Sequence, residues 1–378
     1  MAVRRLSLAG FRTYAELEVD LPAGPQVIVG RNAAGKTNLL EALVVLGLGH
    51  SHRTSSDVEL IAWGSDLARA EAEIDATPSG AVGGRVEVVL VRDGGGARKR
   101  VRINGIARRA AALAGVVRVV LFAPEDMLLV VGSPSLRRSL LDVLVSQRSP
   151  GAAASLSVYG RALQQRNNLL RAIRDGTAAR DELGFWDETV VREGGRIVSW
   201  RLDALAALGA PFAAAHAEIA PEEGRLALRY VSNAAPTEDE DPAAALRRRL
   251  DETAEKELWN GATLVGPHRD DVAFELDGRD LAAFASRGQQ RTAILALKLA
   301  QVELLAGIDG RPPLLLLDDV FSELDPARRA HLVRRIGELP QVFVTTTTLD
   351  DLDPRLVASA TTWEVSMGRL RPLAGAAR

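Results

Sequence analysis

The chain has 378 residues, of which 47% are hydrophobic and 25% charged, which is the composition of a globular protein of two or three domains. It has no cysteine, which excludes disulfides and thiolate metal sites, and its five histidines show no metal-ligand spacing. The net charge of −2 excludes a generally basic surface, so a DNA contact would need a local patch. No apolar run approaches the ~18 residues of a membrane span, and Met1 leads into an alternating pattern rather than a signal segment, so we expect a cytoplasmic protein without a membrane contact.

The N-terminal residues predict a hairpin. Residues 5–8 and 17–21 alternate apolar and polar side chains, as half-buried strands do. Between them stands Phe11-Arg12-Thr13-Tyr14. Arg12 is either a solvated turn residue or a nucleotide contact, because only this hairpin separates it from the glycine-rich loop that follows.

That loop is the organising feature of the chain. Residues 26–29 form a β-branched apolar run, and leucines recur at helical spacing from Leu39 onward. Between them, the sequence fits the phosphate-binding pattern G-x-x-x-x-G-K-[ST] as Gly30-Arg31-Asn32-Ala33-Ala34-Gly35-Lys36-Thr37, followed by Asn38. The two glycines let backbone N–H groups converge on phosphate, and the new helix directs its positive end at the same anion. Lys36 is expected to reach the β- and γ-phosphates, and Thr37 to ligate Mg²⁺.

The next segments predict more strands and a basic cluster. The polar loop at residues 50–54 is either a plain helix exit or a phosphate or DNA contact. Strands are expected at residues 70–74, 84–92 and 98–103, and a core strand at 117–122. The strand at 98–103 carries Arg98, Lys99, Arg100 and Arg102. It is either a solvated edge strand protected by charge or a contact with a DNA backbone.

The middle of the chain has a different pattern. From about residue 135 to 258 helical spacing dominates, although Gly194-Gly195 argues against a single unbroken helix there, and residues 225–231 are expected to form a strand. Glycine and proline recur too often for a long coiled coil, so this region is expected to be a compact lobe. We therefore predict an N-terminal ATPase part at residues 1–134, an inserted helical lobe at 135–260 and a C-terminal ATPase part at 261–378.

The C-terminal third supplies the groups that would complete a phosphate site. A hairpin is expected around residues 272–278, a helix from Ser286, core strands at 314–317 and 341–345, and an edge strand at 361–367. The apolar strand 314–317 ends in Asp318 and Asp319. Asp318 is expected to hold Mg²⁺, and Asp319 to act as a base or to position water beside the γ-phosphate. The competing interpretation is that both acids only cap the next helix.

The helix start at Ser286 suggests a second chain. Ser286, Gly288 and Gln289 would present a hydroxyl and backbone N–H groups to an anion. Since one phosphate loop is already present, this second anion-binding start is expected to contact the nucleotide of a partner. That arrangement is the head-to-tail dimer of ATP-binding-cassette proteins, in which ATP is buried between two subunits.

Motifs along the whole chain resemble the RecF family of the cassette/SMC superfamily. They are Phe11–Tyr14, Gly35–Ala42, Ser51–Thr54, Phe122–Asp126, Gly132–Arg138, Gln165–Leu170, Gly266–Asp271, Ser286–Arg291 and Leu317–Asp325. The resemblance implies an α/β ABC-type P-loop head, with a mixed or parallel sheet, an antiparallel β-subdomain and an inserted helical lobe. It also implies a weak Mg²⁺-dependent ATPase that dimerises on ATP and binds double-stranded DNA at gaps or single-strand/double-strand junctions. RecO and RecR would be its partners in loading the recombinase RecA.

Departures from related patterns leave alternatives open. Ala33 stands where such loops often have a second glycine, no histidine follows residues 341–345, and Asp319 replaces the glutamate usual in transporter cassettes. The last two differences favour slow turnover. The nucleotide-binding subunit of a membrane transporter is the alternative, weakened by the helical lobe and the missing histidine. An ATP-dependent enzyme acting on a small substrate is a third, weakened by the lack of acceptor-site chemistry.

Overall fold

The computed structural model describes residues 1–75 and 83–373, and the chain divides into two compact units that alternate along the sequence. Unit 1 consists of Met1–Met127, Glu218–Ala220 and Arg291–Arg378, and unit 2 of Leu128–Ala217 and Pro221–Gln290. The expected class, an α/β head with an antiparallel subdomain and an inserted mainly helical part, is confirmed. The three-part division at residues 134 and 260 stays a prediction.

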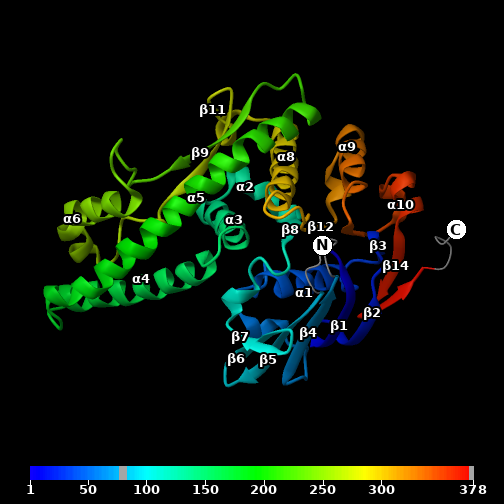
Figure 1. The fold of residues 1–378 in the computed structure, drawn as a ribbon, viewed down its shortest axis with the longest axis horizontal. Coiled ribbons are helices and arrows are strands. Elements are labelled where there is room, and N and C mark those ends of the chain that lie inside the picture. The colour runs from blue at the N-terminus through cyan, green and yellow to red at the C-terminus, as the bar shows by residue number, and fades with distance from the viewer. Residues whose placement is uncertain (76–82, 374–378) are drawn as a thin grey trace. The chain divides into compact units, whose positions relative to one another are not determined.

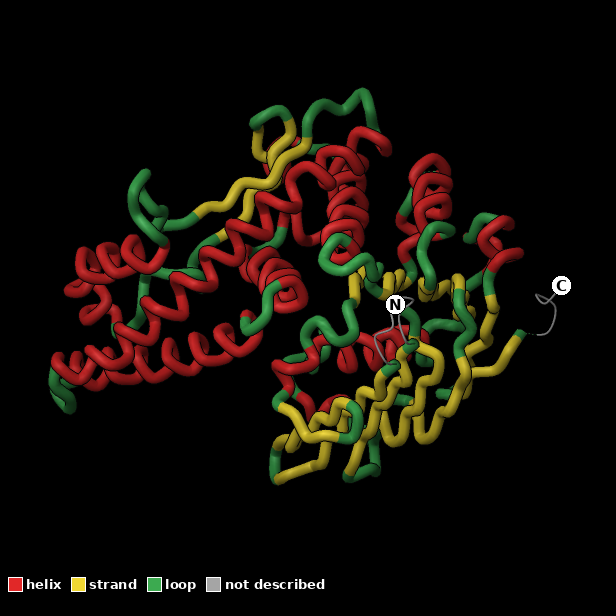
Figure 2. Tube along the Cα trace, viewed as in Figure 1, coloured by secondary structure: helices red, strands yellow, loops and turns green. Residues whose placement is uncertain are grey.

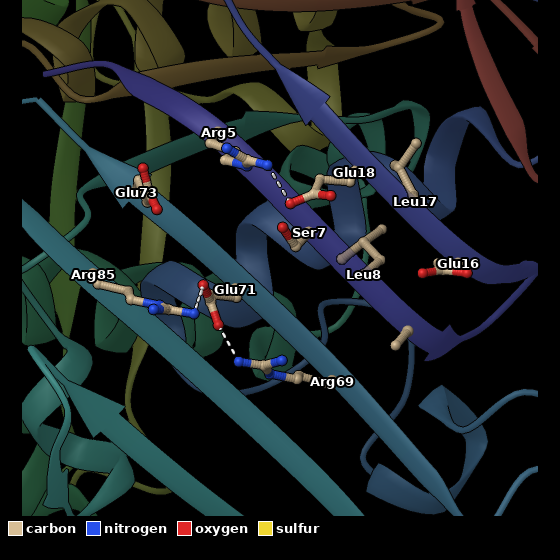
Figure 3. Close-up of a pocket in the computed structure, with 11 residues that line it drawn as sticks. Arg5, Ser7, Leu8, Glu16, Leu17, Glu18, Arg69, Glu71, Glu73 and Arg85 are labelled. Carbon is tan, nitrogen blue, oxygen red and sulfur yellow. Dashed lines mark hydrogen bonds and ion pairs between the residues drawn. The ribbon is translucent and has the colours of Figure 1, made fainter.

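One sheet of unit 1 is antiparallel and has the strand order β2-β1-β4-β5-β6-β7. Its strands are β1 (Val3–Phe11), β2 (Tyr14–Asp20), β4 (Leu67–Ile74), β5 (Gly84–Asp93), β6 (Gly96–Ile103) and β7 (Ile106–Arg108). Alternation gives the sheet one apolar face, where Leu8, Ala70 and Val88 are buried. The opposite face carries charged side chains (Figure 3).

The second sheet of unit 1 has the order β15-β14-β3-β13-β12-β8 and is parallel except for β15. Its strands are β3 (Gly24–Val29), β8 (Val119–Phe122), β12 (Leu314–Asp318), β13 (Gln341–Thr346), β14 (Thr361–Ser366) and β15 (Arg369–Pro372). Because β3, β12 and β13 are parallel neighbours, their carboxyl ends meet at one edge of the sheet. Ligands of open α/β sheets bind at this edge.

Helix α1 (Lys36–Leu48) packs against strands of both sheets (Figure 1). Its side chains from Leu39 to Leu46 are all buried, as expected for a helix that is apolar all round. They share a core with Leu8 of the antiparallel sheet and with Leu316 and Phe343 of the parallel sheet. Two further helices, α9 (Pro326–Ile336) and α10 (Pro354–Ser359), precede β13 and β14 in the chain. The core therefore fixes α1, and with it the loop that precedes α1.

Unit 2 is mainly helical and contains one small antiparallel sheet (Figure 2). Its elements are α2 (Leu128–Val131), α3 (Pro134–Arg148), α4 (Ala152–Arg174), α5 (Gly184–Ile219), β9 (Leu226–Val231), α6 (Pro242–Asn260), β10 (Asp271–Leu276), β11 (Arg279–Asp280) and α7 (Leu281–Phe284). Helix α8 (Arg287–Ala306) begins in unit 2 and continues into unit 1. The predicted strand at 225–231 and the hairpin at 272–278 are confirmed as β9, β10 and β11.

The sequence left open whether a single helix continues through Gly194-Gly195, and α5 runs unbroken through both glycines. Their role is close packing: a Cβ on Gly195 would lie 2.6 Å from the Ala243 Cβ of α6, and one on Gly194 would lie 2.7 Å from Leu246. Helix α5 is also long and apolar enough to cross a membrane by length and composition alone. Its Val190, Val191 and Ile197 are instead part of the core of unit 2.

The strand predicted at residues 361–367 is present as β14, but its predicted position at the edge of the sheet was wrong. β14 pairs with β3 on one side and with β15 on the other. The chain turns back at Met367-Gly368, so the short β15 becomes the edge and Trp363 and Val365 are buried. The sequence gives β15 little apolar signal, which is why the hairpin was not predicted.

Candidate nucleotide-binding site

The glycine-rich loop links β3 to α1, as the sequence predicts, and both of its outer glycines are required by close contacts. A Cβ on Gly30 would lie 2.5 Å from the carbonyl oxygen of Val365. Gly35 has a φ of 116°, and a Cβ there would lie 2.8 Å from the Thr13 hydroxyl. Ala33 also has a positive φ, 63°, where glycine would be unstrained. Arg31, Asn32 and Ala33 are exposed at the tip of the loop.

Lys36 is folded across its own loop. Its ammonium donates hydrogen bonds to the carbonyl oxygens of Gly30 at 2.6 Å and Arg31 at 3.1 Å. Burial lowers the pKa of Lys36, and the nearby carboxylates of Asp319 and Asp318 oppose that shift. The Lys36 ammonium therefore lies near both Asp318 and Asp319, the two acidic residues expected from the sequence. It can exchange its bonds to the loop carbonyls for bonds to phosphate oxygens.

Asp318, at the carboxyl end of β12, is hydrogen-bonded to helix α1 and to the neighbouring strand β13. Its Oδ1 accepts hydrogen bonds from the Thr37 hydroxyl at 3.2 Å and from the Thr345 hydroxyl of β13 at 2.6 Å. Thr37 and Asp318 are the hard oxygen donors that Mg²⁺ prefers, so the donor set fits this cation. Within residues 1–75 and 83–373, no group of three or more acidic or histidine side chains is placed to hold a metal ion by itself, so Mg²⁺ would take its remaining ligands from phosphate and water.

Asp319 has a left-handed backbone with a φ of 53°, a conformation that aspartate tolerates better than most residues. Its N–H donates to the Thr345 hydroxyl at 3.0 Å. Burial raises the pKa of Asp319, Lys36 opposes this shift, and the negative charge of Asp318 adds to it. A half-buried carboxylate with a raised pKa beside a cation can accept a proton from water or hold a water in place.

Arg12 lies beside α1, at the β1–β2 turn. Its guanidinium makes a bidentate pair with the buried Glu41 of α1, with both distances 2.8 Å, and also donates to the carbonyl oxygen of Glu59. Burial acts to raise the pKa of Glu41, but hydrogen bonds from Arg12 and Ser51 outweigh it and hold that pKa below its ordinary value. Arg12 therefore holds the β1–β2 turn against helix α1. Its contact with nucleotide stays a prediction.

The polar segment at residues 50–54 is attached to the same helix. Arg53 donates to the Asn38 side chain at 3.0 Å, and the Asn38 amide donates in turn to the Thr13 hydroxyl at 3.0 Å. The Ser51 hydroxyl donates to Glu41. This network links the β1–β2 turn, Asn38 and the segment after α1 into one polar layer, which favours a supporting role for residues 50–54.

Ser286, Gly288 and Gln289 lie at the start of α8, in unit 2. Ser286 is exposed and forms a reciprocal capping box with Gln289: its N–H donates to Gln289 Oε1 at 3.0 Å, and its hydroxyl accepts from the Gln289 N–H at 3.2 Å. The capping box leaves the Ser286 hydroxyl proton free to point outward. The contact of these residues with a partner's nucleotide stays a prediction.

Three of the basic side chains of strand β6 are paired with nearby acidic side chains. Arg98 pairs with Asp93, Lys99 with Asp57 and Arg102 with Glu87. A surface that binds a phosphate backbone needs cations free to replace counterions. The pairing therefore favours the solvated-strand interpretation of this cluster, and the DNA contact stays a prediction.

A concave surface on the charged face of the antiparallel sheet has a volume of ≈ 270 Å³ (Figure 3). Its guanidinium groups are already paired: Arg5 with Glu18, and both Arg69 and Arg85 with Glu71. Because these arginines are paired with glutamates of the same sheet, this surface is a weaker candidate for an anion site than the loop at Gly30.

Two residues at the site were not singled out for a role by sequence. Glu41 was noted only as part of a motif, although it is the buried carboxylate that holds Arg12. Thr345 was noted only as the last residue of the expected core strand 341–345. The parallel register that pairs it with Asp318 was the missing information, because alternation alone does not say which threonine faces the site.

Comparison with known proteins agrees with this geometry. The family model described as RecF/RecN/SMC N terminal domain matches residues 2–356. The chain is 39% identical over 375 residues to the DNA replication and repair protein RecF of Limosilactobacillus fermentum, covering 98% of this chain and 99% of the relative. It is 37% identical over 375 residues to that of Bacillus subtilis, covering 98% and 100%.

Solved structures extend the similarity to the fold. The structure described as the recombination mediator protein RecF-ATP in the RecFOR pathway matches with a TM-score of 0.88 and 29% identity, covering 98% of this chain and 97% of that one. An Smc head bound to the C-terminal winged-helix domain of ScpA matches with a TM-score of 0.53 at 17% identity, a likeness of fold alone. The full-length matches, together with the loop and acid residues at one sheet edge, lead to one assignment: this chain belongs to the RecF family of DNA replication and repair proteins.

Proposed function

We propose that the chain is an ATP-dependent DNA-binding protein of recombinational repair with slow, Mg²⁺-dependent hydrolysis. The proposal is supported above all by the convergence of Lys36, Thr37, Asp318 and Asp319 at one sheet edge. Together they supply a phosphate cradle, a cation, two Mg²⁺ ligands and a candidate base, the groups that phosphoryl transfer to water requires. The solved RecF-ATP relative supports ATP as the nucleotide.

We propose that ATP binding at this site serves to assemble a dimer of the chain rather than to make a chemical product. ATP would join two copies head to tail, with Ser286, Gly288 and Gln289 of one copy completing the nucleotide site of the other. The dimer would bind double-stranded DNA at gaps and single-strand/double-strand junctions. With RecO- and RecR-type partners it would help load a RecA-type recombinase in the cytoplasm. Hydrolysis would then release the dimer.

The binding half of the proposal is tested by titrating a fluorescent ATP analogue with Mg²⁺ into the wild-type chain, Lys36→Met and Lys256→Met. Lys256 is an exposed lysine of α6 and is the matched control. Loss of a charged hydrogen-bond donor to phosphate costs ~1.5–3 kcal/mol, so Lys36→Met should weaken binding roughly 10- to 100-fold. Lys256→Met should bind like wild type. Equal affinity in all three chains would overturn the assignment of the loop.

The DNA half is tested by binding of labelled duplex in the presence of Mg²⁺ and ATP over a range of salt concentrations. If contacts with the phosphate backbone dominate, the logarithm of affinity should fall linearly and steeply with the logarithm of salt. The Lys36→Met chain should lose the part of DNA binding that ATP stimulates. DNA binding that ignores both ATP and salt would contradict the proposal.

A further inference from the structure

One buried hydroxyl touches both acids of the nucleotide site. Thr345 is the residue of β13 that pairs with Asp318 of β12 in the parallel register. Its side chain is fully buried, at 0% exposure. Its Oγ1 lies 2.6 Å from Asp318 Oδ1 and 3.0 Å from the backbone nitrogen of Asp319.

The direction of these two hydrogen bonds follows from the groups involved. The N–H of Asp319 can only donate, so Thr345 must accept there. An ionised Asp318 can only accept, so the single hydroxyl proton of Thr345 must point to it. The only proton of the hydroxyl is therefore donated to one acid, and one of its lone pairs accepts from the backbone of the other.

Each bond constrains a different part of the expected chemistry. The bond to Asp318 fixes the carboxylate that also accepts from Thr37, and so orients the two expected Mg²⁺ ligands toward one another. The bond from Asp319 fixes the backbone of a residue held at a φ of 53°. The chain direction after β12 is therefore fixed at Asp319, and the Asp319 carboxylate lies near Lys36. Removal of the hydroxyl would release the carboxylate of one acid and the backbone of the other.

We infer that Thr345 is a positioning residue that sets the cation coupling of this site, the factor by which Mg²⁺ tightens nucleotide binding. The inference rests on the proposed nucleotide-binding function and deepens it. Thr345 acts on the cation through Asp318 and on hydrolysis through Asp319. It leaves untouched the loop N–H groups and Lys36, which hold nucleotide without a cation.

Thr362 of β14 provides a matched control. It is a threonine of the same sheet, its side chain is buried at 3% exposure, and its hydroxyl has no hydrogen-bond partner among the residues that the structure describes. Thr362→Val is therefore the same chemical change in the same sheet without loss of a hydrogen bond. It separates the Thr345 hydrogen bonds from the general effect of removing a buried hydroxyl.

The test measures the affinity of a fluorescent ADP analogue in EDTA and in excess Mg²⁺ for wild type, Thr345→Val, Thr345→Ser and Thr362→Val. Thermal melting of each chain checks folding. The cation coupling should fall about 10-fold in Thr345→Val, equivalent to loss of ~1.4 kcal/mol, while affinity in EDTA stays within about twofold of wild type. Thr345→Ser and Thr362→Val should keep wild-type coupling, and slowed ATP turnover should accompany only Thr345→Val.

Three results would overturn the inference: wild-type coupling in Thr345→Val, an equal loss of affinity with and without Mg²⁺, or a serine variant that behaves like the valine variant. If Thr345→Val does not fold, Thr345→Cys keeps a group of similar size with a weaker donor and should show intermediate coupling. Full wild-type coupling in Thr345→Cys would then also contradict the inference. A wild-type chain that binds no nucleotide would instead contradict the proposed function.

Discussion

Ala33 holds a backbone conformation that costs free energy in any residue with a side chain. Its φ of 63° places it in the left-handed region, and its side chain is exposed at the tip of the nucleotide loop. The sequence already marked this position as one where related loops often have glycine. The structure gives the physical reason, because only glycine adopts this conformation without a steric penalty.

Ala33→Gly is therefore expected to stabilise the chain by about 0.5–1 kcal/mol. The relieved strain, of order 1–2 kcal/mol, exceeds the entropy that glycine adds to the unfolded state. The measurement is the free energy of unfolding in urea. Ala34→Gly, one residue further along the loop where φ is not positive, is the control and should destabilise by a similar amount. Destabilisation by both changes would show that the Ala33 backbone is unstrained in solution.

Asp319→Asn tests the role of the second acid. Asparagine keeps the size of the side chain but cannot take a proton, while Asp318 and Thr37 still offer their oxygens to Mg²⁺. Loss of a general base typically slows a reaction by about 10²–10⁴-fold. We therefore expect normal binding of ATP with Mg²⁺, strongly slowed phosphate release and accumulation of an ATP-bound dimer. Asp239→Asn, in the exposed loop before α6, serves as the control. Normal turnover in Asp319→Asn would refute the assignment.

At the scale of elements, the sequence predicted most strands and helices. It did not predict the packing around helix α5 or the pairing of strand β14. The run of helical spacing after residue 184 was correctly interpreted as helical, although the glycine pair argued against a single unbroken helix. Helix propensity counts a glycine as a local cost, whereas here the missing Cβ atoms allow α5 and α6 to approach closely. Only the position of α6 in space could reveal this.

Gly195→Ala should therefore destabilise unit 2, although alanine is the better helix former. The added Cβ would lie 2.6 Å from the Ala243 Cβ and 2.7 Å from its Cα, so α5 and α6 would have to separate, at a cost of about 1–3 kcal/mol. Gly209 of the same helix has open space at its Cβ position. Gly209→Ala should be stabilising by about 0.5–1 kcal/mol. The comparison is made by thermal and urea unfolding, and equal effects of the two changes would contradict the packing account.

The Gly266–Asp271 segment, whose role the sequence left open, belongs to a buried polar network in unit 2. His268 Nδ1 lies 2.7 Å from the Tyr159 hydroxyl, and Tyr230 donates to Asp270 at 2.6 Å. Burial lowers the pKa of His268 to about 4, and the nearby charge of Arg269 acts in the same direction. The histidine is therefore neutral in the folded chain at neutral pH.

This shift predicts a loss of stability in acid. Between pH 6.5, the ordinary pKa of histidine, and about 4, the unfolded chain binds a proton at this position and the folded chain does not. The free energy of unfolding should therefore fall as pH falls through this window, by up to roughly 1.4 kcal/mol per pH unit from this group. His268→Asn should lack this component, so the difference between the two unfolding profiles isolates it from the carboxylates. Parallel profiles would show that His268 is not protected from protonation.

At the scale of the whole molecule, the family and the fold class were predictable because the motifs are spread along the whole chain. The nucleotide loop and the acid pair were predictable because each follows an apolar strand. The ion pair between Arg12 and Glu41 and the hydrogen bond from Thr345 to Asp318 were not predictable from the sequence, because they depend on which elements become neighbours in the fold. The basic strand β6 was ambiguous by sequence for a similar reason, since its acidic partners lie on other segments.

We propose that nucleotide binding controls the assembly of two chains. Lys36, Thr37, Asp318 and Asp319 are proposed to form the part of the site that one chain supplies, and Ser286 is expected to complete it from a second chain. The exposed Ser286 hydroxyl at the start of α8 has the chemistry for this role. An arginine at this position would block a close approach of phosphate to the helix start, while the loop of the same chain would be unchanged.

The most direct measurement is the molar mass by light scattering of wild type, Ser286→Arg and Ser157→Arg, each with Mg²⁺ and ATP and with or without duplex DNA. Ser157, an exposed serine of α4, is the matched control. Wild type and Ser157→Arg should double in mass with ATP, whereas Ser286→Arg should stay monomeric and still bind nucleotide with wild-type affinity. ATP-dependent dimers of Ser286→Arg equal to those of wild type would contradict the account.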